Sequence, residues 1–423
     1  MQKKRLISLD VFRGLTIILM TIVNNPGDWG SVYPPLLHAE WHGCTPTDLV
    51  FPFFIFIVGV SVSFAIPEKI WNAGTFEKIL VRSLRIFCLG LFLNFFSKIN
   101  LFGWEGIPLA VVRLLITIAV SYALMADFKG RTKLYLVLLI FFCLLLLAFG
   151  GFEDFKNVRI PGVLQRIGIV YFITSVLYLL TGFRGQIAAA VFLLIFYWIL
   201  MTQVQIPGFG APNLNKATNM AAWVDNALLE GHMYVVSKTW DPEGILSTIP
   251  AIASCIIGLL IGQLLNSSVP KLKKLQYMAG LGVVLLLAGI LWDKSFPINK
   301  PLWTSSYVLF VSGLAILCLN VLYWLIEVLN LNKWTPFFVI WGVNPMIVFF
   351  YSGVIPRVLG MIKLTNPEDA TSQINLQAYL YQYGIARFFE NPMNASLAGA
   401  LTYVLIWTLI LWIFYKNKLI FKV

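Results

Sequence analysis

Two of the three histidines in this chain stand at the beginning of an apolar run, in the stretch LLHAEWHGCTPTDLVFPFFIF at residues 36–56. Burying a helix in lipid requires no histidine at such a place. Histidine takes up and returns a proton near neutral pH more readily than any other side chain. His38 and His42 are therefore candidates for proton transfer, and the alternative is that each is a loop histidine exposed to water.

An acid follows the two histidines. Thr45 before Pro46 is typical of the start of a helix, with threonine as the N-cap and proline as the first helical residue. Asp48 then falls in the first turn, where the helix dipole favours an anion. Capping of the helix is the alternative to any chemical role for Asp48.

Further polar side chains interrupt or end apolar runs, where they are costly enough to suggest a functional site. Asp10 and Arg13 lie three residues apart, either as a local ion pair or as a basic group that meets an anionic ligand from inside. Asn24 and Asn25 end the same run. Their amides either cap the helix or donate a hydrogen bond to a carbonyl oxygen.

The stretch VRIPGVLQRIG at residues 158–168 forms another polar cluster. Pro161 suits a helix start, which places Gln165 and Arg166 about one turn inside the helix. Arg159 and Arg166, seven residues apart, are predicted to share a helical face. Lipid offers no hydrogen-bond partners, so the Gln165–Arg166 pair must face the interior of a bundle, for structural bracing or for function.

The elements that position these residues are membrane helices. The 423 residues are 59% hydrophobic and 12% charged, with a mean hydropathy of +0.81, which excludes a soluble protein. The apolar runs are continuous and have no period of two, so a β-barrel is excluded. We predict an all-α polytopic transmembrane helical bundle with about 12 spans, at roughly 8–24, 46–66, 78–98, 107–126, 132–150, 161–181, 185–203, 245–266, 275–293, 303–328, 336–355 and 394–416.

The distribution of Lys and Arg predicts the orientation. Basic residues concentrate in short segments on one side, beginning with Lys3, Lys4 and Arg5, which indicates cytoplasmic N- and C-termini. The net charge of +12 is thus explained by topology, and nucleic acid is not expected as a partner. Asp10 and Arg13 interrupt the first apolar run, so we expect an uncleaved first span.

We predict a single membrane domain over residues 1–423, with long outer loops at 204–244 and 356–393. A short amphipathic helix is expected near 375–389. The five cysteines are scattered, which gives neither a disulfide framework nor a metal-ligand spacing, and nucleotide-binding motifs are absent from the sequence.

Several of these stretches, in this order, resemble the heparan-α-glucosaminide N-acetyltransferase family of lysosomal enzymes and their bacterial relatives. The matching stretches are SLDVFRGLTIILMTIVN (8–24), HAEWHGCTPTDLVFPFFIFIVG (38–59), VRIPGVLQRIGIVYF (158–172), AAWVDNALLEGHMY (221–234), DPEGILSTI (241–249) and PINKPLWTSSYV (297–308). The resemblance implies transfer of an acetyl group from cytosolic acetyl-CoA to the amine of a glucosamine-type sugar across the membrane. It also implies a homodimer.

The resemblance assigns roles to particular residues. It makes His38 the general base and Asn24 its partner, an amide that donates to the acetyl carbonyl oxygen. Asp48 would then orient His38, as a carboxylate does in catalytic triads. A route in which His38 is acetylated first stays open.

The remaining candidates would contact the two substrates. Arg13, Arg82 and Arg85 would meet the phosphates of acetyl-CoA, and Gln165 and Arg166 would line its path or the reaction centre. For the acceptor we predict contacts with six outer residues, in which the carboxylates recognise an ammonium or hydroxyls and a tryptophan stacks on the sugar: Glu40, Trp41, Arg159, Trp240, Asp241 and Glu243. Capping of the next helix is the alternative for Asp241 and Glu243.

Two other functions stay open. Twelve spans with intramembrane charges also suit an amino-sugar transporter, although the polar residues cluster at span ends. An O-acyltransferase that modifies envelope glycans would use the same histidine with another acceptor. The lack of eukaryotic targeting features favours a bacterial inner membrane.

Overall fold

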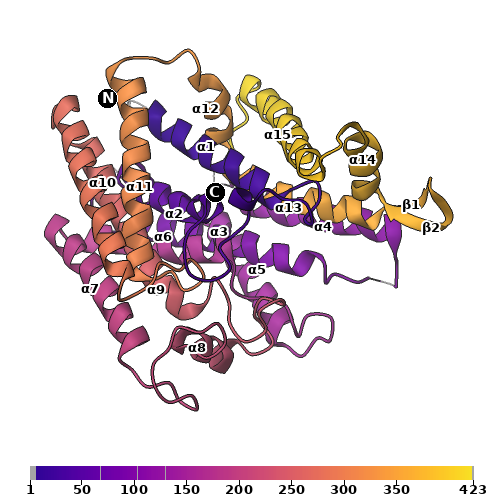
Figure 1. The fold of residues 1–423 in the computed structure, drawn as a ribbon, viewed down its shortest axis with the longest axis horizontal. Helices are drawn as coiled ribbons and strands as arrows, with labels where there is room; N and C mark the ends of the chain where they lie inside the picture. The colour runs from indigo at the N-terminus through magenta and orange to yellow at the C-terminus, as the bar shows by residue number, and fades with distance from the viewer. Residues whose placement is uncertain (1–5, 67, 102, 129, 422–423) are drawn as a thin grey trace.

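The computed structural model describes residues 6–66, 68–101, 103–128 and 130–421, and these are mostly α-helical (Figure 1). A hairpin of β1 (Lys363–Asn366) and β2 (Asp369–Asn375) supplies the strands of the described chain. The predicted all-α class is confirmed. The basic residues Lys3, Lys4 and Arg5, which entered the orientation argument, lie outside the described residues.

Eleven described helices are long and apolar enough to cross a membrane, and each matches a predicted span. At 1.5 Å per residue, 18–25 residues cover the hydrocarbon core of a bilayer. They are α1 (Ile7–Asn24), α2 (Val50–Ala65, preceded by a 3-10 turn over Pro46–Leu49), α3 (Ala73–Phe96), α4 (Gly106–Met125), α5 (Thr132–Phe149), α6 (Val163–Leu180), α7 (Phe183–Thr202), α9 (Ile245–Asn266), α10 (Lys271–Asp293), α11 (Ser305–Tyr323, continued by a π turn over Trp324–Val328) and α15 (Pro392–Lys416).

The predicted span 336–355 is not one straight helix. It is divided into α12 (Thr335–Val343) and α13 (Pro345–Met361), which are bent by 74° at Asn344. Pro345 has no N–H to donate and disfavours helical geometry at the residue before it. The Asn344 amide instead donates to the Leu419 carbonyl at 3.0 Å and accepts from the Phe421 N–H at 2.9 Å. The break therefore anchors the C-terminal segment.

The two long loops contain local structure. Residues 204–244 include α8 (Met220–Leu229). The predicted loop 356–393 begins too early, because α13 continues to Met361, and the helix expected near 375–389 is the shorter α14 (Leu376–Gly384).

α2 and α9 lie at the centre of the bundle, and glycines bring them close together. A Cβ atom on Gly59 would lie 1.9 Å from the Cys255 carbonyl oxygen, and one on Gly258 would lie 2.1 Å from that of Phe56. About 70% of each helix is buried, against about 20% of the peripheral α5, α10 and α15. Figure 1 accordingly draws α2 in the middle of the bundle and α10 and α15 at its edges.

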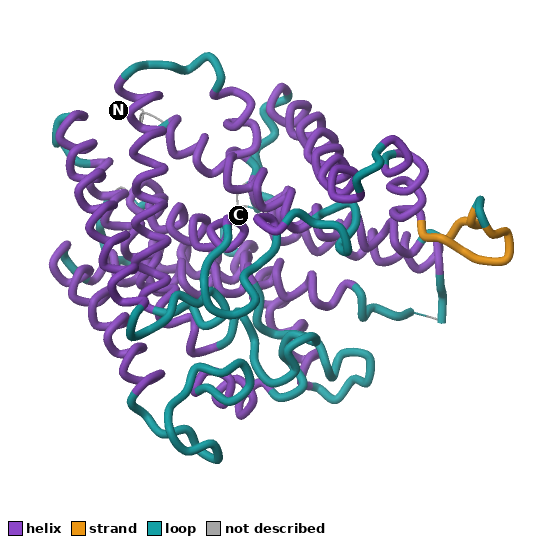
Figure 2. The backbone as a smooth tube through the Cα atoms, viewed as in Figure 1, coloured by secondary structure: helices purple, strands orange, loops and turns teal. Residues whose placement is uncertain are grey.

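Both described ends of the chain lie on one side of the bundle, which we call the termini side. Leu6 and Phe421 line the same cavity, and Ser8 donates to Glu327 at the end of α11. α1 leads from there to Asn24 on the opposite side, which we call the loop side. Figure 2 shows the 204–244 loop at the bottom of the view, away from the N-terminus, and the β1–β2 hairpin apart from it at the right edge.

Candidate active site at the loop side

Asp48 and His38 form a hydrogen-bonded pair on the loop side. Asp48 lies in the 3-10 turn that begins at Pro46, and its carboxylate is fully buried. Its Oδ2 accepts the backbone N–H groups of Thr45 and Ala39, both at 3.0 Å. Its Oδ1 lies 2.7 Å from Nδ1 of His38, whose ring is exposed. The helix start thus fixes the carboxylate, and the carboxylate orients the imidazole.

Lys300 completes this group and was missed in the sequence. Its Nζ lies 3.0 and 3.3 Å from the two ring nitrogens of His38 and 3.4 Å from Oδ1 of Asp48. Burial lowers the pKa of Lys300 below its ordinary value, and the charges of Asp48 and Glu243 oppose this shift only in part. Lys300 belongs to the matching stretch PINKPLW, so its place in that motif is the signal that could have identified it.

The loop that carries Lys300 is held rigidly. Asn299 accepts the Leu302 N–H at 2.8 Å, and Tyr197 donates to the Leu302 carbonyl at 2.6 Å. Trp303 has a φ of 53°, which is unusual for a bulky residue. Its side chain is fully buried, and its indole N–H donates a hydrogen bond to the Ser254 hydroxyl at 3.1 Å. A strained residue persists only where its surroundings fix it, so the position of Lys300 is well defined.

Arg166 and Gln165 brace this region and line neither of the two cavities described below. The Arg166 guanidinium lies 5.1 Å from the Trp303 ring centre and donates to the Gly244 carbonyl at 3.2 Å and to Ser247. Gln165 donates to the Ile160 carbonyl at 3.0 Å. Their predicted contact with acetyl-CoA finds no support in this geometry, because both side chains are enclosed between helices.

A cavity of about 140 Å³ opens beside His38. Asn24, in the last turn of α1, lines it, whereas the Asn25 amide turns back to the Thr21 carbonyl at 3.0 Å. Its lining residues are Thr16, Met20, Val23, Asn24, His38, Thr47, Val50, Phe51, Phe54, Val163, Glu243, Lys300 and Phe349. We call this space the outer cavity.

Arg159 pairs with the two acids that were expected to bind the acceptor. It contacts both oxygens of Asp241, at 2.5 and 2.8 Å, and Glu243 at 2.5 Å. Burial alone would lower the pKa of Arg159, but the bonds to Asp241 and the charge of Glu243 raise it. Asp241 also accepts the N–H groups of Tyr234 and Glu243, both at 2.9 Å. Both carboxylate oxygens of Asp241 are therefore used in hydrogen bonds within the protein. Of these two acids, only Glu243 lines the outer cavity.

Arg159 does not share a helical face with Arg166, so that prediction is wrong. α6 begins at Val163, after Pro161 and Gly162, and Arg159 lies in the non-helical segment before it. That segment lets it reach Asp241 while Arg166 packs inside the bundle.

The other predicted acceptor contacts lie outside the cavity. Trp41 packs edge-on against Trp240 with ring centres 5.2 Å apart, and its indole N–H donates to the Leu214 carbonyl at 2.8 Å. These contacts hold the 204–244 loop over the His38 segment. Glu40 is exposed, and His42 lies 3.4 Å from the Asn299 amide.

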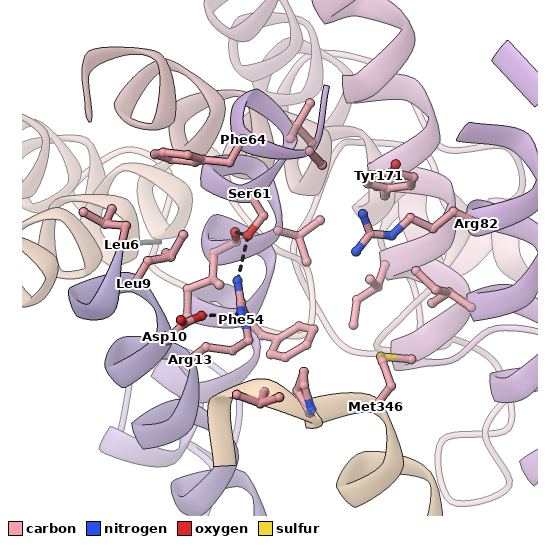
Figure 3. A pocket seen from close by; sticks show the side chains of 18 of the residues that line it. Leu6, Leu9, Asp10, Arg13, Phe54, Ser61, Phe64, Arg82, Tyr171 and Met346 are labelled. Carbon is pink, nitrogen blue, oxygen red and sulfur yellow. Dashed lines mark hydrogen bonds and ion pairs between the residues drawn. The ribbon is translucent and has the colours of Figure 1, made fainter. Parts of the chain in front are cut away.

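A larger cavity of about 500 Å³ lies on the termini side, and we call it the inner cavity (Figure 3). Arg82 points into it over the Tyr171 ring, 5.0 Å from the ring centre, and no carboxylate pairs with it within the described part of the chain. Arg13 also lines it but donates to Asp10, Ser61 and the Gly342 carbonyl at 3.0–3.1 Å. The local ion pair is therefore present. Arg85 is turned away and donates to the Ala126 carbonyl.

Four helices contribute to both cavities, at successive depths, and α3 and α12 add residues to the inner cavity. α1 supplies residues 9, 10 and 13 to the inner cavity and 16, 20, 23 and 24 to the outer one, and α2, α6 and α13 likewise contribute to both. Of the described residues, Phe54 on α2 alone lines both. The two cavities thus follow one another along α2 and meet at Phe54, and we call this pair of cavities the lane along α2.

Comparison with known proteins agrees with the resemblance. Residues 5–157 match the family model described as heparan-alpha-glucosaminide N-acetyltransferase, catalytic. Human heparan-alpha-glucosaminide N-acetyltransferase is 29% identical over 400 residues, covering 82% of this chain and 52% of the human protein. The mouse protein of the same name is 27% identical over 474 residues, covering 99% of this chain and 60% of its own length. The chain thus spans little more than half the length of these proteins, and over that part it is similar to the heparan-α-glucosaminide N-acetyltransferases.

Proposed function

We propose that the protein is an acetyltransferase that carries acetyl from acetyl-CoA, bound at the termini side, to the amine of a glucosamine-type sugar at the loop side. The observation that carries this proposal is the lane along α2, with Arg82 at one end and a histidine–carboxylate pair at the other. The names of the human and mouse relatives support the reaction class.

The length of the lane suits the shape of acetyl-CoA. Ser61 on α2 lines the inner cavity and Thr47, in the turn before α2, lines the outer one, and the fourteen residues from one to the other rise about 21 Å. Ser61, Phe54 and Thr47 are seven residues apart and so lie on one face of the helix. A thin pantetheine arm can occupy such a lane while the phosphates stay at the termini side. Arg82, which no described carboxylate neutralises, is the residue we assign to those phosphates.

The loop-side groups are those that acyl transfer to an amine requires. His38 takes the proton of the attacking amine, and Asp48 on Nδ1 holds the ring so that Nε2 accepts it. The carbonyl oxygen gains negative charge as the amine adds. Lys300 and Asn24 face the same cavity and are the donors that would stabilise that charge. The C–S bond then breaks, and the CoA thiolate leaves along the lane.

The direct test is acetyl transfer from labelled acetyl-CoA to glucosamine by the purified protein in detergent or vesicles. Wild type is compared with His38→Ala and with His42→Ala, a matched histidine four residues away that does not line the cavity. We expect product from wild type and His42→Ala and loss of at least about 100-fold with His38→Ala. Equal activity of His38→Ala and wild type would refute the assignment.

The same assay separates the alternative functions. A transporter would accumulate free sugar in vesicles without acetylating it. An O-acyltransferase would make an ester that mild alkali cleaves, whereas the amide product withstands it.

The position in the cell is part of the proposal. The membrane is the bacterial inner membrane, and the distribution of Lys and Arg supports an orientation with both termini in the cytoplasm. A homodimer follows from the family resemblance. The mass of the solubilised protein and protease accessibility of the termini in vesicles test these two points.

A further inference from the structure

We propose that the side chain of Phe54 is the barrier between the inner and outer cavities and that it restricts transfer to short acyl groups. The proposal rests on the proposed function for its acyl-transfer part, whereas the barrier itself can be tested without any transfer. It concerns one side chain on α2, 8% exposed, that lines both cavities.

The residues on either side of Phe54 show that the lining changes there from one cavity to the other. One turn toward the termini side, Ile57 and Val58 line only the inner cavity, and one turn toward the loop side, Val50 and Phe51 line only the outer cavity. On α6 and α13 the lining passes in the same way from one cavity to the other, at residues 167 to 163 and 346 to 349. Figure 3 shows the Phe54 ring directed into the inner cavity between Arg13 and Met346.

The backbone of α2 cannot move aside to open the lane. Gly59 and Gly258 hold α2 against α9 so closely that an added Cβ atom would lie 1.9 or 2.1 Å from a carbonyl oxygen. The aromatic side chain, by contrast, turns about its two side-chain bonds. Passage of an acyl group therefore requires rotation of the Phe54 ring while the helices stay in place.

Such a barrier has two consequences. When the lane is empty, the ring separates the two cavities and prevents water-soluble molecules from crossing. When a thioester enters, the acyl group must pass the ring and then fit an outer cavity that has less than a third of the volume of the inner one. The small acetyl group is hindered least by the ring and by the small outer cavity. Each added methylene increases both hindrances.

The first experiment compares acetyl-CoA with butyryl-CoA as donors for wild type, Phe54→Ala and Phe53→Ala. Phe53 is the matched control, because it precedes Phe54 on α2, packs against Phe12 at 5.5 Å and lines neither cavity. We expect the butyryl-to-acetyl ratio of kcat/KM to rise at least about tenfold in Phe54→Ala and to stay within about threefold of wild type in Phe53→Ala, since pockets discriminate one methylene by about 10–200-fold. An unchanged ratio in Phe54→Ala would overturn the size restriction.

The second experiment tests the barrier without any transfer. Met20→Cys places a thiol in the outer cavity, and sealed vesicles with the termini side outward are treated with a small charged methanethiosulfonate. Mass spectrometry of the peptide that carries the introduced thiol should show clearly more labelling in Met20→Cys/Phe54→Ala than in Met20→Cys/Phe53→Ala. Equal labelling, high or low, would overturn the barrier. A labelling difference in a protein that transfers no acyl group would retain the barrier and refute the proposed function.

Discussion

Replacing Asp48 by asparagine should stop catalysis while leaving the fold intact, and the reason lies in how the two carboxylate oxygens are used. Oδ2 accepts two backbone N–H groups and the Thr45 hydroxyl, all at 3.0 Å. These donors require an acceptor, so the amide oxygen of Asp48→Asn should take that position. The amide NH₂ then occupies the place of Oδ1 and donates to Nδ1 of His38.

This reversal puts the ring proton on Nε2, where the attacking amine must deliver its own proton. A catalytic histidine held in the wrong tautomer loses about 10⁴ in kcat, which is about 5.5 kcal/mol in the activation barrier. The KM for acetyl-CoA should change little, because the inner cavity is untouched. The melting temperature should also change little, because the helix start keeps its acceptor.

The assay is steady-state acetyl transfer beside thermal unfolding of the same preparations. Asp225→Asn is the matched control, because Asp225 is equally buried and also accepts two N–H groups, from Asp241 at 3.1 Å and Ile245 at 2.9 Å, but contacts neither His38 nor Lys300. It should keep kcat within about tenfold of wild type. A folded Asp48→Asn protein within about tenfold of wild type would refute the tautomer argument, as would an equal loss in both variants.

Three more predictions follow from single contacts. Lys300→Met should lower kcat by about 10²–10³, the usual effect of removing one oxyanion donor, while Lys300→Arg keeps the charge and should retain more activity; equal kcat in Lys300→Met and wild type would exclude the role. Arg82→Ala should raise the KM for acetyl-CoA at least about tenfold with little change in kcat, whereas Arg85→Ala, three residues away and outside the cavity, should not; titrating acetyl-CoA distinguishes them. Burial raises the pKa of Asp225 from its ordinary value of 3.8 to about 6, so the folded state binds the proton more tightly than the unfolded state. Wild type should therefore lose stability as the pH rises through that interval. Melting temperatures over the same pH range should show no such loss in Asp225→Asn.

Local properties of the sequence determined the membrane architecture. Length and hydropathy are carried within each run, so eleven spans were predicted close to their observed ends. The helix start at Pro46 and the pairing of Asp10 with Arg13 are also local, since their partners lie within one turn. The catalytic role proposed for His38 rests on the resemblance, because a single histidine in a loop has no local pattern that reveals its use.

Tertiary packing decided which of these residues meet. Lys300 reaches His38 across 262 residues, and Arg159 reaches Asp241 across 82, so neither contact leaves a periodic signal in the sequence. The bend at Asn344 depends on the C-terminal segment that returns to it. The place of Phe54 between two cavities depends on the depth and rotation of four helices, which hydropathy does not specify because every face of a central helix is apolar.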